Sequence, residues 1–294
     1  MNKSSPSFVI LNGEVISTKE ASIHVDDRGF LYGESIFTTI RCYGGVPFRV
    51  IRHCDRLNNS LSSPVVDIDY HVDFAKLETD IQQLLKLNKC PDAAVRFTIT
   101  RGCATGPLPP QRLTPTTLLS LHPFAPDTSL LSRGASLCIS NIRRDPAGDI
   151  GKHKLGSYFP SLLARRQAFN KGHDESVICD TDGNFLECAC SNLFAVLDGT
   201  LVTPDTTENI LPGIAREGVL ECAAAIGLKT SLETLTSDIQ KNAKEWLITN
   251  SLMEIVPVAS LGENRFFVPG SVTSRLLGEF KDLVASEIRS EKHE

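Results

Sequence analysis

Two stretches of the chain carry side chains whose types suit covalent chemistry. One holds the lysines Lys152 and Lys154. The other starts at the acidic residue Glu187, on a predicted strand, and ends at Gly213, where a Pro-Gly step opens a predicted helix. A helix N-terminus offers unpaired backbone N–H groups and a positive dipole end, which suit a phosphate. An acid for a ring nitrogen, a phosphate cradle and a lysine are the parts that a pyridoxal phosphate site requires.

Each of these residues also has an ordinary structural interpretation. Lys152 and Lys154 both qualify by position for covalent catalysis, which needs a lysine that is uncharged for part of the reaction. On composition alone, however, a short basic run indicates a solvated surface loop. Glu187 taken alone indicates an exposed strand acid. The functional interpretation therefore depends on the wider pattern.

Strands and helices that could position these residues are predicted along the whole chain. Asn12-Gly13 and Gly44-Gly45 supply the positive φ angles of two hairpin turns, whereas 24–33 is predicted to be a loop that leads into a strand. Asp73 is the expected N-cap of an amphipathic helix. Further strands are predicted at 36–41, 93–101, 116–121, 135–142, 175–179 and 246–249, and further helices at 157–169, 214–226 and 272–288.

The proline-containing stretch 123–127 is the best candidate for a domain boundary. We therefore expect an N-terminal α/β domain at 1–122, a linker at 123–130 and a C-terminal, cofactor-binding domain at 131–294. We expect an α/β fold with some α+β character.

Composition limits the classes of function. The chain has 294 residues, 41% apolar and 22% charged, which is ordinary for a globular protein. A net charge of −5 gives no reason to expect nucleic acid or membrane partners. Nine scattered cysteines suit a reducing compartment, and we find neither a signal peptide nor a membrane span. These features predict a cytoplasmic protein with a small-molecule substrate.

A metal site is not favoured by the sequence. Cys188 and Cys190 are separated by one residue, and no second cysteine pair stands at zinc spacing. The seven histidines show no ligand spacing either. We therefore expect no metal, and interpret the two cysteines as packing residues.

The spacing of the second stretch resembles that of the class IV aminotransferases, which are fold-type IV pyridoxal phosphate enzymes. This family includes branched-chain aminotransferases, D-amino acid aminotransferases and 4-amino-4-deoxychorismate lyases. The matching features run from about Asn12 to Val258. The residues that carry the resemblance are Glu187, Ala189, Asn192, Leu193, Phe194, Leu201, Thr203, Leu211, Gly213, Ile214 and Arg216.

The resemblance implies a fold and a cofactor arrangement. It implies two domains, each with a mixed sheet and flanking helices, and pyridoxal 5′-phosphate in the cleft between them. It also implies a homodimer in which a loop of the partner completes the pocket.

The resemblance further implies roles for particular residues. Counting back from the Ala-x-x-x-Ala helix selects Lys154, rather than Lys152, as the lysine that binds the cofactor. Glu187 would pair with the pyridine nitrogen, and Arg56, within His-Cys-Asp-Arg56-Leu, would hold the phosphate. The cofactor-binding residues implied in this way are Arg56, Lys154, Glu187, Ile214, Ala215, Asn250 and Ser251.

Two short features separate the reactions of the family. Thr38 follows Phe37 where aminotransferase relatives usually carry a glutamate, and the turn at Asn250 resembles that of the lyases. Both indicate a 4-amino-4-deoxychorismate lyase, in which Thr38 would help to position the departing side chain and Arg101 would meet a substrate carboxylate. The loop at 102–112 departs from the lyase pattern. The alternatives are an aminotransferase of branched-chain or D-amino acids and a non-catalytic relative kept for binding.

Overall fold

The computed structural model describes residues 6–108 and 112–291, which fall into two compact units. Unit 1 comprises Met1–Ala125, His153–Tyr158 and Glu287–Glu294, and unit 2 comprises Pro126–Lys152 and Phe159–Ser286. The first change of unit lies inside the predicted linker 123–130. The predicted boundaries differ from these units at 153–158 and at the C-terminal end, which belong to unit 1 although 131–294 was expected to be one domain.

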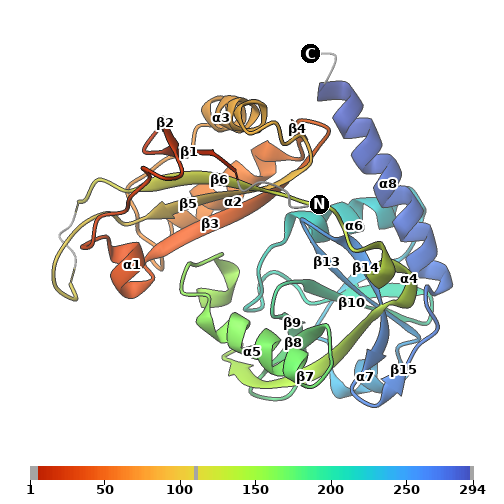
Figure 1. The fold of residues 1–294 in the computed structure, drawn as a ribbon. Helices are drawn as coiled ribbons and strands as arrows, with labels where there is room; N and C mark the ends of the chain where they lie inside the picture. The colour runs from red at the N-terminus through yellow and green to blue at the C-terminus, as the bar shows by residue number, and fades with distance from the viewer. Residues whose placement is uncertain (1–5, 109–111, 292–294) are drawn as a thin grey trace. The chain divides into compact units, whose positions relative to one another are not determined.

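Unit 1 is an antiparallel sheet with helices, in the strand order β2-β1-β6-β5-β3-β4 (Figure 1). The mixed sheet expected here is therefore found only in unit 2. Neighbouring strands of unit 1 pair antiparallel because short hairpins join several of them. The elements of unit 1 are β1 (Phe8–Leu11), β2 (Glu14–Ser17), α1 (Arg28–Tyr32), β3 (Ser35–Tyr43), β4 (Val46–Pro47), α2 (Val50–Leu61), α3 (Phe74–Leu87), β5 (Ala93–Thr100) and β6 (Thr117–Pro123).

Local sequence signals account for much of unit 1. Asn12 and Gly13 adopt φ angles of 53° and 84° in the β1–β2 turn, as a primed hairpin turn requires. The Asp73 carboxylate accepts the Lys76 N–H and so caps α3. The stretch 28–33, expected to be a loop, instead forms the single turn of α1, because the Asp27 carboxylate caps it.

The core of unit 1 lies between the sheet and the two helices α2 and α3, which contact each other. Alternate residues of β3 and β5 face this core, whereas Phe37 of β3 and Arg96 of β5 stand in the opposite phase of the alternation. The two faces of the sheet therefore present different chemistry.

The segment 153–158 pairs with β3 although its flanking residues belong to unit 2. The Phe37 N–H donates to the Lys154 carbonyl at 2.9 Å, and the Gly156 N–H donates to the Ser35 carbonyl at 2.6 Å. These bonds satisfy backbone groups on both segments and hold residues 153–158, the lysine-bearing segment, against β3.

Unit 2 is a mixed sheet in the order β12-β11-β10-β13-β14-β7-β8-β9, with β15 paired to β14. The β11–β12, β14–β7 and β7–β8 pairs are parallel. The last residues of α8, from Glu287, are assigned to unit 1. The elements are α4 (Thr128–Arg133), β7 (Ala135–Arg144), the 3-10 turn η1 (Ile150–Lys152), α5 (Phe159–Asn170), β8 (Glu175–Asp180), β9 (Phe185–Cys188), β10 (Asn192–Leu197), β11 (Thr200–Thr203), α6 (Ile214–Ala225), β12 (Thr230–Leu232), α7 (Ser237–Asn242), β13 (Glu245–Asn250), β14 (Glu254–Leu261), β15 (Asn264–Arg265) and α8 (Ser271–Glu291).

Helix α5 turns two of its large apolar side chains outward. Leu162 and Phe169 are 52% and 76% exposed. Ala164 and Ala168 are buried instead, against β7 and β8. Small side chains at this contact let the helix approach the sheet closely, so its larger residues are turned outward.

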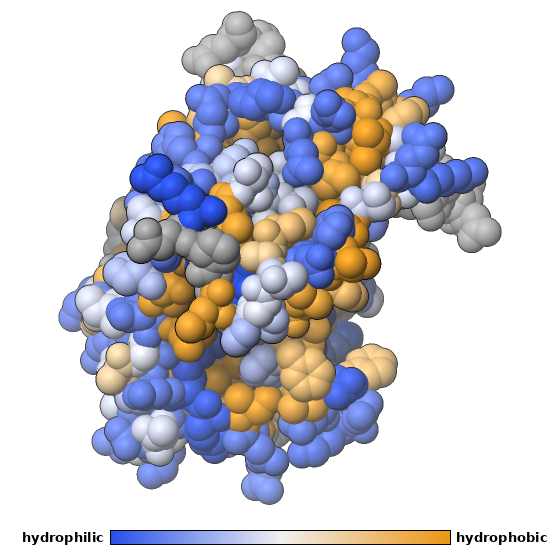
Figure 2. Space-filling view, turned by 90° about the vertical axis from the view of Figure 1, so that its left-hand side faces the viewer, coloured by the Kyte–Doolittle hydropathy of each residue, from blue (hydrophilic) through white to orange (hydrophobic). Residues whose placement is uncertain are grey.

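On the face seen in Figure 2, hydrophilic side chains are spread among hydrophobic ones. No helix within residues 6–108 and 112–291 combines the length and the apolar character that crossing a bilayer requires.

Candidate active site

The lysine-bearing segment is held on unit 1 by a histidine as well as by its backbone. The His153 Nδ1 atom lies 2.9 Å from the hydroxyl of Ser60, near the end of α2. A Cβ atom on Gly156 would overlap the Ser35 hydroxyl, so a glycine permits the close approach of the segment to β3. Lys154 is thereby placed beside β3 and α2.

Lys154 and Lys152 have different surroundings. The Lys154 ammonium lies 4.7 Å from the ring centroid of Phe37 and 5.6 Å from that of Tyr158. In unit 2, the Lys152 ammonium forms an ion pair with Asp149 at 2.8 Å. The amine of Lys154 is thus held against two ring faces, whereas that of Lys152 is paired with a carboxylate. The contacts support the choice of Lys154, which stays a prediction.

Thr38, His53 and Arg56 form a buried polar chain in unit 1. The Thr38 hydroxyl lies 2.6 Å from His53 Nδ1, and Arg56 Nη2 donates to the same oxygen at 3.0 Å. Thr38 is 0% and His53 1% exposed. Burial lowers the pKa of His53 well below 6.5, and the charges of Arg56 and Lys154 lower it further. Burial also lowers the pKa of Arg56 to about 10. The predicted substrate role of Thr38 is not tested by these contacts.

Arg96 is a candidate residue that the sequence did not single out. Its guanidinium carbon lies 3.5 Å from the centroid of Phe37, the ring that also faces Lys154. Its Nε atom donates to Thr98 at 3.1 Å, and within the described residues neither terminal nitrogen has a hydrogen-bond acceptor. Arg96 can therefore offer two parallel N–H groups to a carboxylate. Only the alternation of β5 could have indicated it.

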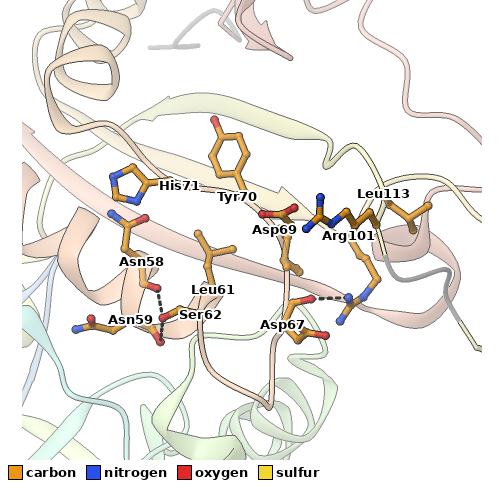
Figure 3. Close-up of a pocket in the computed structure, with 12 residues that line it drawn as sticks. Asn58, Asn59, Leu61, Ser62, Asp67, Asp69, Tyr70, His71, Arg101 and Leu113 are labelled. Atoms are coloured by element: carbon orange, nitrogen blue, oxygen red, sulfur yellow. Dashed lines mark hydrogen bonds between the residues drawn. The ribbon is translucent and has the colours of Figure 1, made fainter.

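Arg101 is placed differently from its expected role. It donates to Glu34 at 2.8 Å and to the carbonyls of Val66 and Asp67 at 2.6 Å each. The bond to Asp67 is drawn in Figure 3, where Arg101 lines an open, polar hollow of about 540 Å³. Most of its donors are thus committed within unit 1, and its contact with a substrate carboxylate stays a prediction.

The hollow in Figure 3 is separate from the lysine-bearing segment. Its lining comes from α2, from the segment that follows α2 and from residues around Arg101, and it mixes acidic and basic side chains. Lys154, Thr38 and Arg56 do not line it. We therefore do not assign the hollow to the cofactor. Pro109 and Pro110, of the predicted 102–112 loop, lie outside the described residues.

In unit 2, Glu187 on β9 is fixed from several directions. Its carboxylate accepts from Arg144 at 2.7 Å, from the Asn192 amide at 3.2 Å and from the Leu211 N–H at 3.2 Å. Arg144 also donates to the carbonyl of Asn209 at 2.7 Å. Glu187 is 7% exposed, so its charge is compensated rather than solvated. The sequence did not single out Arg144, because the two residues lie on different strands.

The start of α6 fits a phosphate. Gly213 is its N-cap and offers no side chain, and a Cβ atom there would overlap the Asn192 amide oxygen. Ile214 and Ala215 are buried, yet within the described residues their N–H groups have no acceptor. Buried helix donors without a cap need an anion or water as partner. The residues present therefore fit the phosphate of the predicted cofactor.

Arg216 follows in the first turn of α6. Its Nη2 donates to the carbonyl of Pro204 at 2.7 Å, whereas its buried Nε has no hydrogen-bond partner among the described residues. Burial lowers its pKa, and the charges of Asp205 and Glu187 oppose that shift. Arg216 thus anchors the segment before α6 and adds positive charge near the helix start.

The turn after β13 holds the remaining predicted cofactor residues. The Asn250 side-chain oxygen accepts the N–H groups of Leu252 at 3.0 Å and Met253 at 2.9 Å. Its amide also donates to Ser191 at 3.0 Å. Asn250 therefore shapes the turn, whereas the Ser251 hydroxyl has no partner among the described residues. Their contact with a phosphate stays a prediction.

The cysteines offer no metal centre in the described residues. Burial raises the pKa of Cys188 well above its ordinary value, which favours a protonated thiol over a metal-binding thiolate. Within 6–108 and 112–291, no group of histidine, cysteine and acidic side chains is placed to hold a metal ion.

Comparison with known proteins places these features in a family. The sequence pattern of the family described as amino-transferase class IV matches residues 35–261. A protein of Methanocaldococcus jannaschii assigned as a branched-chain-amino-acid aminotransferase is 33% identical over 281 residues, covering 94% of this chain and 96% of its own. The aminodeoxychorismate lyase of Bacillus subtilis is 29% identical over 290 residues, covering 98% and 97%.

A solved structure agrees with the sequence match. The T.th. branched-chain amino acid aminotransferase, determined with pyridoxamine 5′-phosphate, superposes with a TM-score of 0.87 at 27% identity, covering 95% of this chain and 94% of its own. The chain therefore belongs to the class IV aminotransferases, α/β enzymes that use pyridoxal 5′-phosphate.

Proposed function

We propose that the protein is a lyase that converts 4-amino-4-deoxychorismate to 4-aminobenzoate and pyruvate. The observation that carries the proposal is Thr38, which stands beside Arg56 where aminotransferase relatives usually have a glutamate. A glutamate at this position would place a carboxylate against Arg56. Threonine adds no negative charge there, so the surroundings of Arg56 are more positive than they would be with a glutamate at position 38.

The charge of Arg96 suits a substrate that carries carboxylates, and 4-amino-4-deoxychorismate has two. Arg96 lies over the Phe37 ring that also faces Lys154, whereas Lys154 and Arg56 are assigned to the cofactor in this proposal. An aliphatic amino-acid side chain would gain little from this cation and would need an apolar pocket instead. We propose Arg96 as a carboxylate partner, with its two terminal nitrogens as donors.

The residues proposed to bind the cofactor differ in kind between the two units. In unit 1, Lys154 would form the covalent link and Arg56 would hold the phosphate. In unit 2, Glu187 would pair with the ring nitrogen. In the same unit, the backbone N–H groups of Ile214 and Ala215 would hold the phosphate, together with the turn residues Asn250 and Ser251. The cofactor, when bound, supplies an electron sink for a carbanion.

The chain's own residues would then move the proton. Lys154 Nζ, in its uncharged form, would remove the ring proton beside the substrate nitrogen. Arg144 would keep Glu187 oriented toward the ring nitrogen throughout. The carbon–oxygen bond to the enolpyruvyl group would then break and the ring would become aromatic. The departing enolpyruvate would take up the proton that the lysine removed and become pyruvate, so no keto acid is needed as acceptor.

An aminotransferase of branched-chain amino acids is the second candidate. The observation that favours it is the 33% identity to the relative from Methanocaldococcus jannaschii, which exceeds the 29% identity to the Bacillus subtilis lyase. This reaction would use the same lysine, acid and phosphate donors. It requires a keto-acid acceptor, and this requirement separates the two reactions.

The deciding experiment supplies 4-amino-4-deoxychorismate to the pyridoxal-loaded protein without any keto acid. We expect 4-aminobenzoate and pyruvate in equal amounts, and no product from Lys154→Ala. The parallel assay offers leucine with 2-oxoglutarate. Glutamate formed there, with no 4-aminobenzoate in the first assay, would reject the lyase. A Thr38→Glu variant should lose elimination and gain amino transfer, because it adds the carboxylate of the aminotransferases.

We also propose that the protein acts as a homodimer. The segment around α1 exposes Val25 at 70% and Phe30 at 77%, and Leu108 of the same unit is exposed at 86%. Apolar side chains left in water are typical of surfaces that another protein covers. One chain has a mass of 32.1 kDa, and light scattering of the purified protein should give twice that value. A monomer at micromolar concentration would reject this proposal.

A further inference from the structure

A hydroxyl and an imidazole lie in contact beneath the predicted phosphate-binding arginine, and neither the family match nor the proposed reaction gives the imidazole a role. Thr38 of β3 touches His53 of α2 at 2.6 Å. Arg56 lies one helical turn further along α2 and donates to the same hydroxyl at 3.0 Å. All three residues belong to unit 1.

Counting hydrogens fixes the direction of these bonds. Arg56 can only donate, so it occupies a lone pair of the Thr38 oxygen. The Thr38 hydrogen then needs an acceptor, and within the described residues His53 Nδ1 is the one at hydrogen-bond distance. The chain therefore runs from Arg56 to Thr38 to His53, with His53 neutral and its proton on Nε2.

A charged His53 would reverse this chain. Its Nδ1 would carry a proton and donate to Thr38, whose own hydrogen would then have no acceptor. The surroundings oppose that state: burial lowers the pKa of His53, and the nearby charges of Arg56, Lys154 and Arg49 act in the same direction. Neutral His53 is thus the state in which the bonds from Arg56 to Thr38 and from Thr38 to His53 can both form.

The pair is not a nucleophile and its base. Hydroxyl and imidazole in contact can form a covalent catalyst when the oxygen faces a substrate. Here the oxygen is fully buried and accepts a bond from a guanidinium, which draws electron density from it. Its hydrogen-bonding capacity is directed to Arg56 rather than to a reacting atom.

We propose that His53 is a positioning residue that, through Thr38, fixes the side chain of Arg56 for the phosphate of the cofactor. This inference rests on the role proposed for Arg56. An arginine has several rotatable bonds, and holding it in one rotamer before the anion arrives lowers the entropy lost on binding. Thr38 then acts on the cofactor as well as on the choice of reaction.

The test compares two ligands that differ only in the phosphate. Apoprotein is titrated with pyridoxal 5′-phosphate and with pyridoxal, and binding is followed by absorbance. We expect His53→Phe and Thr38→Val to weaken pyridoxal 5′-phosphate roughly tenfold, the loss of one hydrogen bond to a charged group. Binding of pyridoxal should change by less than about twofold, because that ligand does not use Arg56.

Conservative variants distinguish a specific loss of phosphate binding from a general loss of structure. His53→Asn keeps an acceptor and Thr38→Ser keeps the hydroxyl, so each should recover most of the phosphate-dependent affinity. In an Arg56→Met background, Thr38→Val should have no further effect on either ligand. Equal weakening of both ligands, no recovery in the conservative variants, or an additive effect in the Arg56→Met background would each overturn the inference.

These titrations contain no substrate. Their outcome is therefore independent of whether the protein proves to be a lyase or an aminotransferase. A protein that fails the lyase assay but shows the phosphate-selective losses would keep this inference and lose only the proposed reaction.

Discussion

The two units present their candidate catalytic groups in different ways. In unit 2, Glu187 accepts bonds from Arg144, Asn192 and a backbone N–H, and the start of α6 offers backbone donors that cannot rotate. In unit 1, the candidate groups are the ends of long cationic side chains, and Lys154 and Arg96 lie against the ring of Phe37. One unit is rigid at its reactive groups, and the other places ends of flexible side chains.

The difference follows from the work proposed for each residue. An acid that pairs with a ring nitrogen has to stay in place through the reaction, and a network of fixed donors provides this. A lysine that binds the cofactor and then moves a proton has to change position. Contact with ring faces limits its hydration without fixing its direction. Substitutions that remove the fixed donors of unit 2 or the movable side chains of unit 1 test this difference.

The largest effect is expected for Lys154→Ala, which removes the mobile group of unit 1. Activity should fall by about 10³-fold or more, because nothing else can replace a general base at that position. Lys152→Ala is the matched control, with an expected change below about twofold, since its ion pair with Asp149 is exposed. Mass spectrometry after borohydride reduction should find the cofactor on Lys154. An adduct on Lys152 would exchange the two roles.

Removing the fixed acid of unit 2 should have the next largest effect. Glu187→Gln should lower activity about 10²-fold while the shape of the site is kept, the size of loss typical of a preorganised charge. Arg144→Met should lower it less, about tenfold, because Glu187 keeps its bonds to Asn192 and Leu211. Steady-state rates and the absorbance of the bound cofactor measure both. An Arg144→Met effect larger than that of Glu187→Gln would give Arg144 a direct role.

Alanine substitutions at two glycines, one in each unit, test how well each unit tolerates an added methyl group. A Cβ atom on Gly213 would overlap the amide oxygen of Asn192, whose side chain is held by Glu187 and by the Leu211 carbonyl. Gly213→Ala should therefore cost about 1–3 kcal/mol in free energy of unfolding. Gly156→Ala meets the hydroxyl of Ser35, which can rotate, and should cost below about 1 kcal/mol. Urea denaturation measures both, and the reverse order would contradict the comparison.

The smallest effect concerns the pH dependence of stability. His53 has a lower pKa when folded than when unfolded, so the unfolded chain binds the extra proton first as pH falls. The stability linked to His53 is complete above about pH 6.5 and should fall by about 1 kcal/mol by pH 5.5. His53→Gln removes this dependence, and unfolding curves at the two pH values should show a smaller difference for the variant. An unchanged difference would mean that His53 is charged in the folded protein.

Local features of the fold were predictable from sequence. Asn12-Gly13 predicted the first hairpin, and Asp73 predicted the start of α3, because the residues that decide these features are neighbours in sequence. The turn of α1 was missed because its cap, Asp27, is also held by Thr100 and Thr116, far away along the chain. Such contacts leave no local signal.

The sequence also determined the family and its cofactor. The spacing from Glu187 to Arg216 is a constraint on one continuous stretch, in which strand, turn and helix follow one another. The match of the family pattern to residues 35–261 confirmed that interpretation. A lysine, an acid and a helix start are recognisable as types wherever they lie in the fold.

Only the tertiary structure decided what each of these groups is bonded to. Arg101 was expected to offer its donors to a substrate, and the fold commits most of them to Glu34 and to two carbonyls. Arg144 and His53 were not singled out, and they prove to hold Glu187 and Thr38. The physical reason is that a hydrogen bond depends on two atoms meeting in space. Residues on separate strands and helices reach each other only once the whole unit has folded.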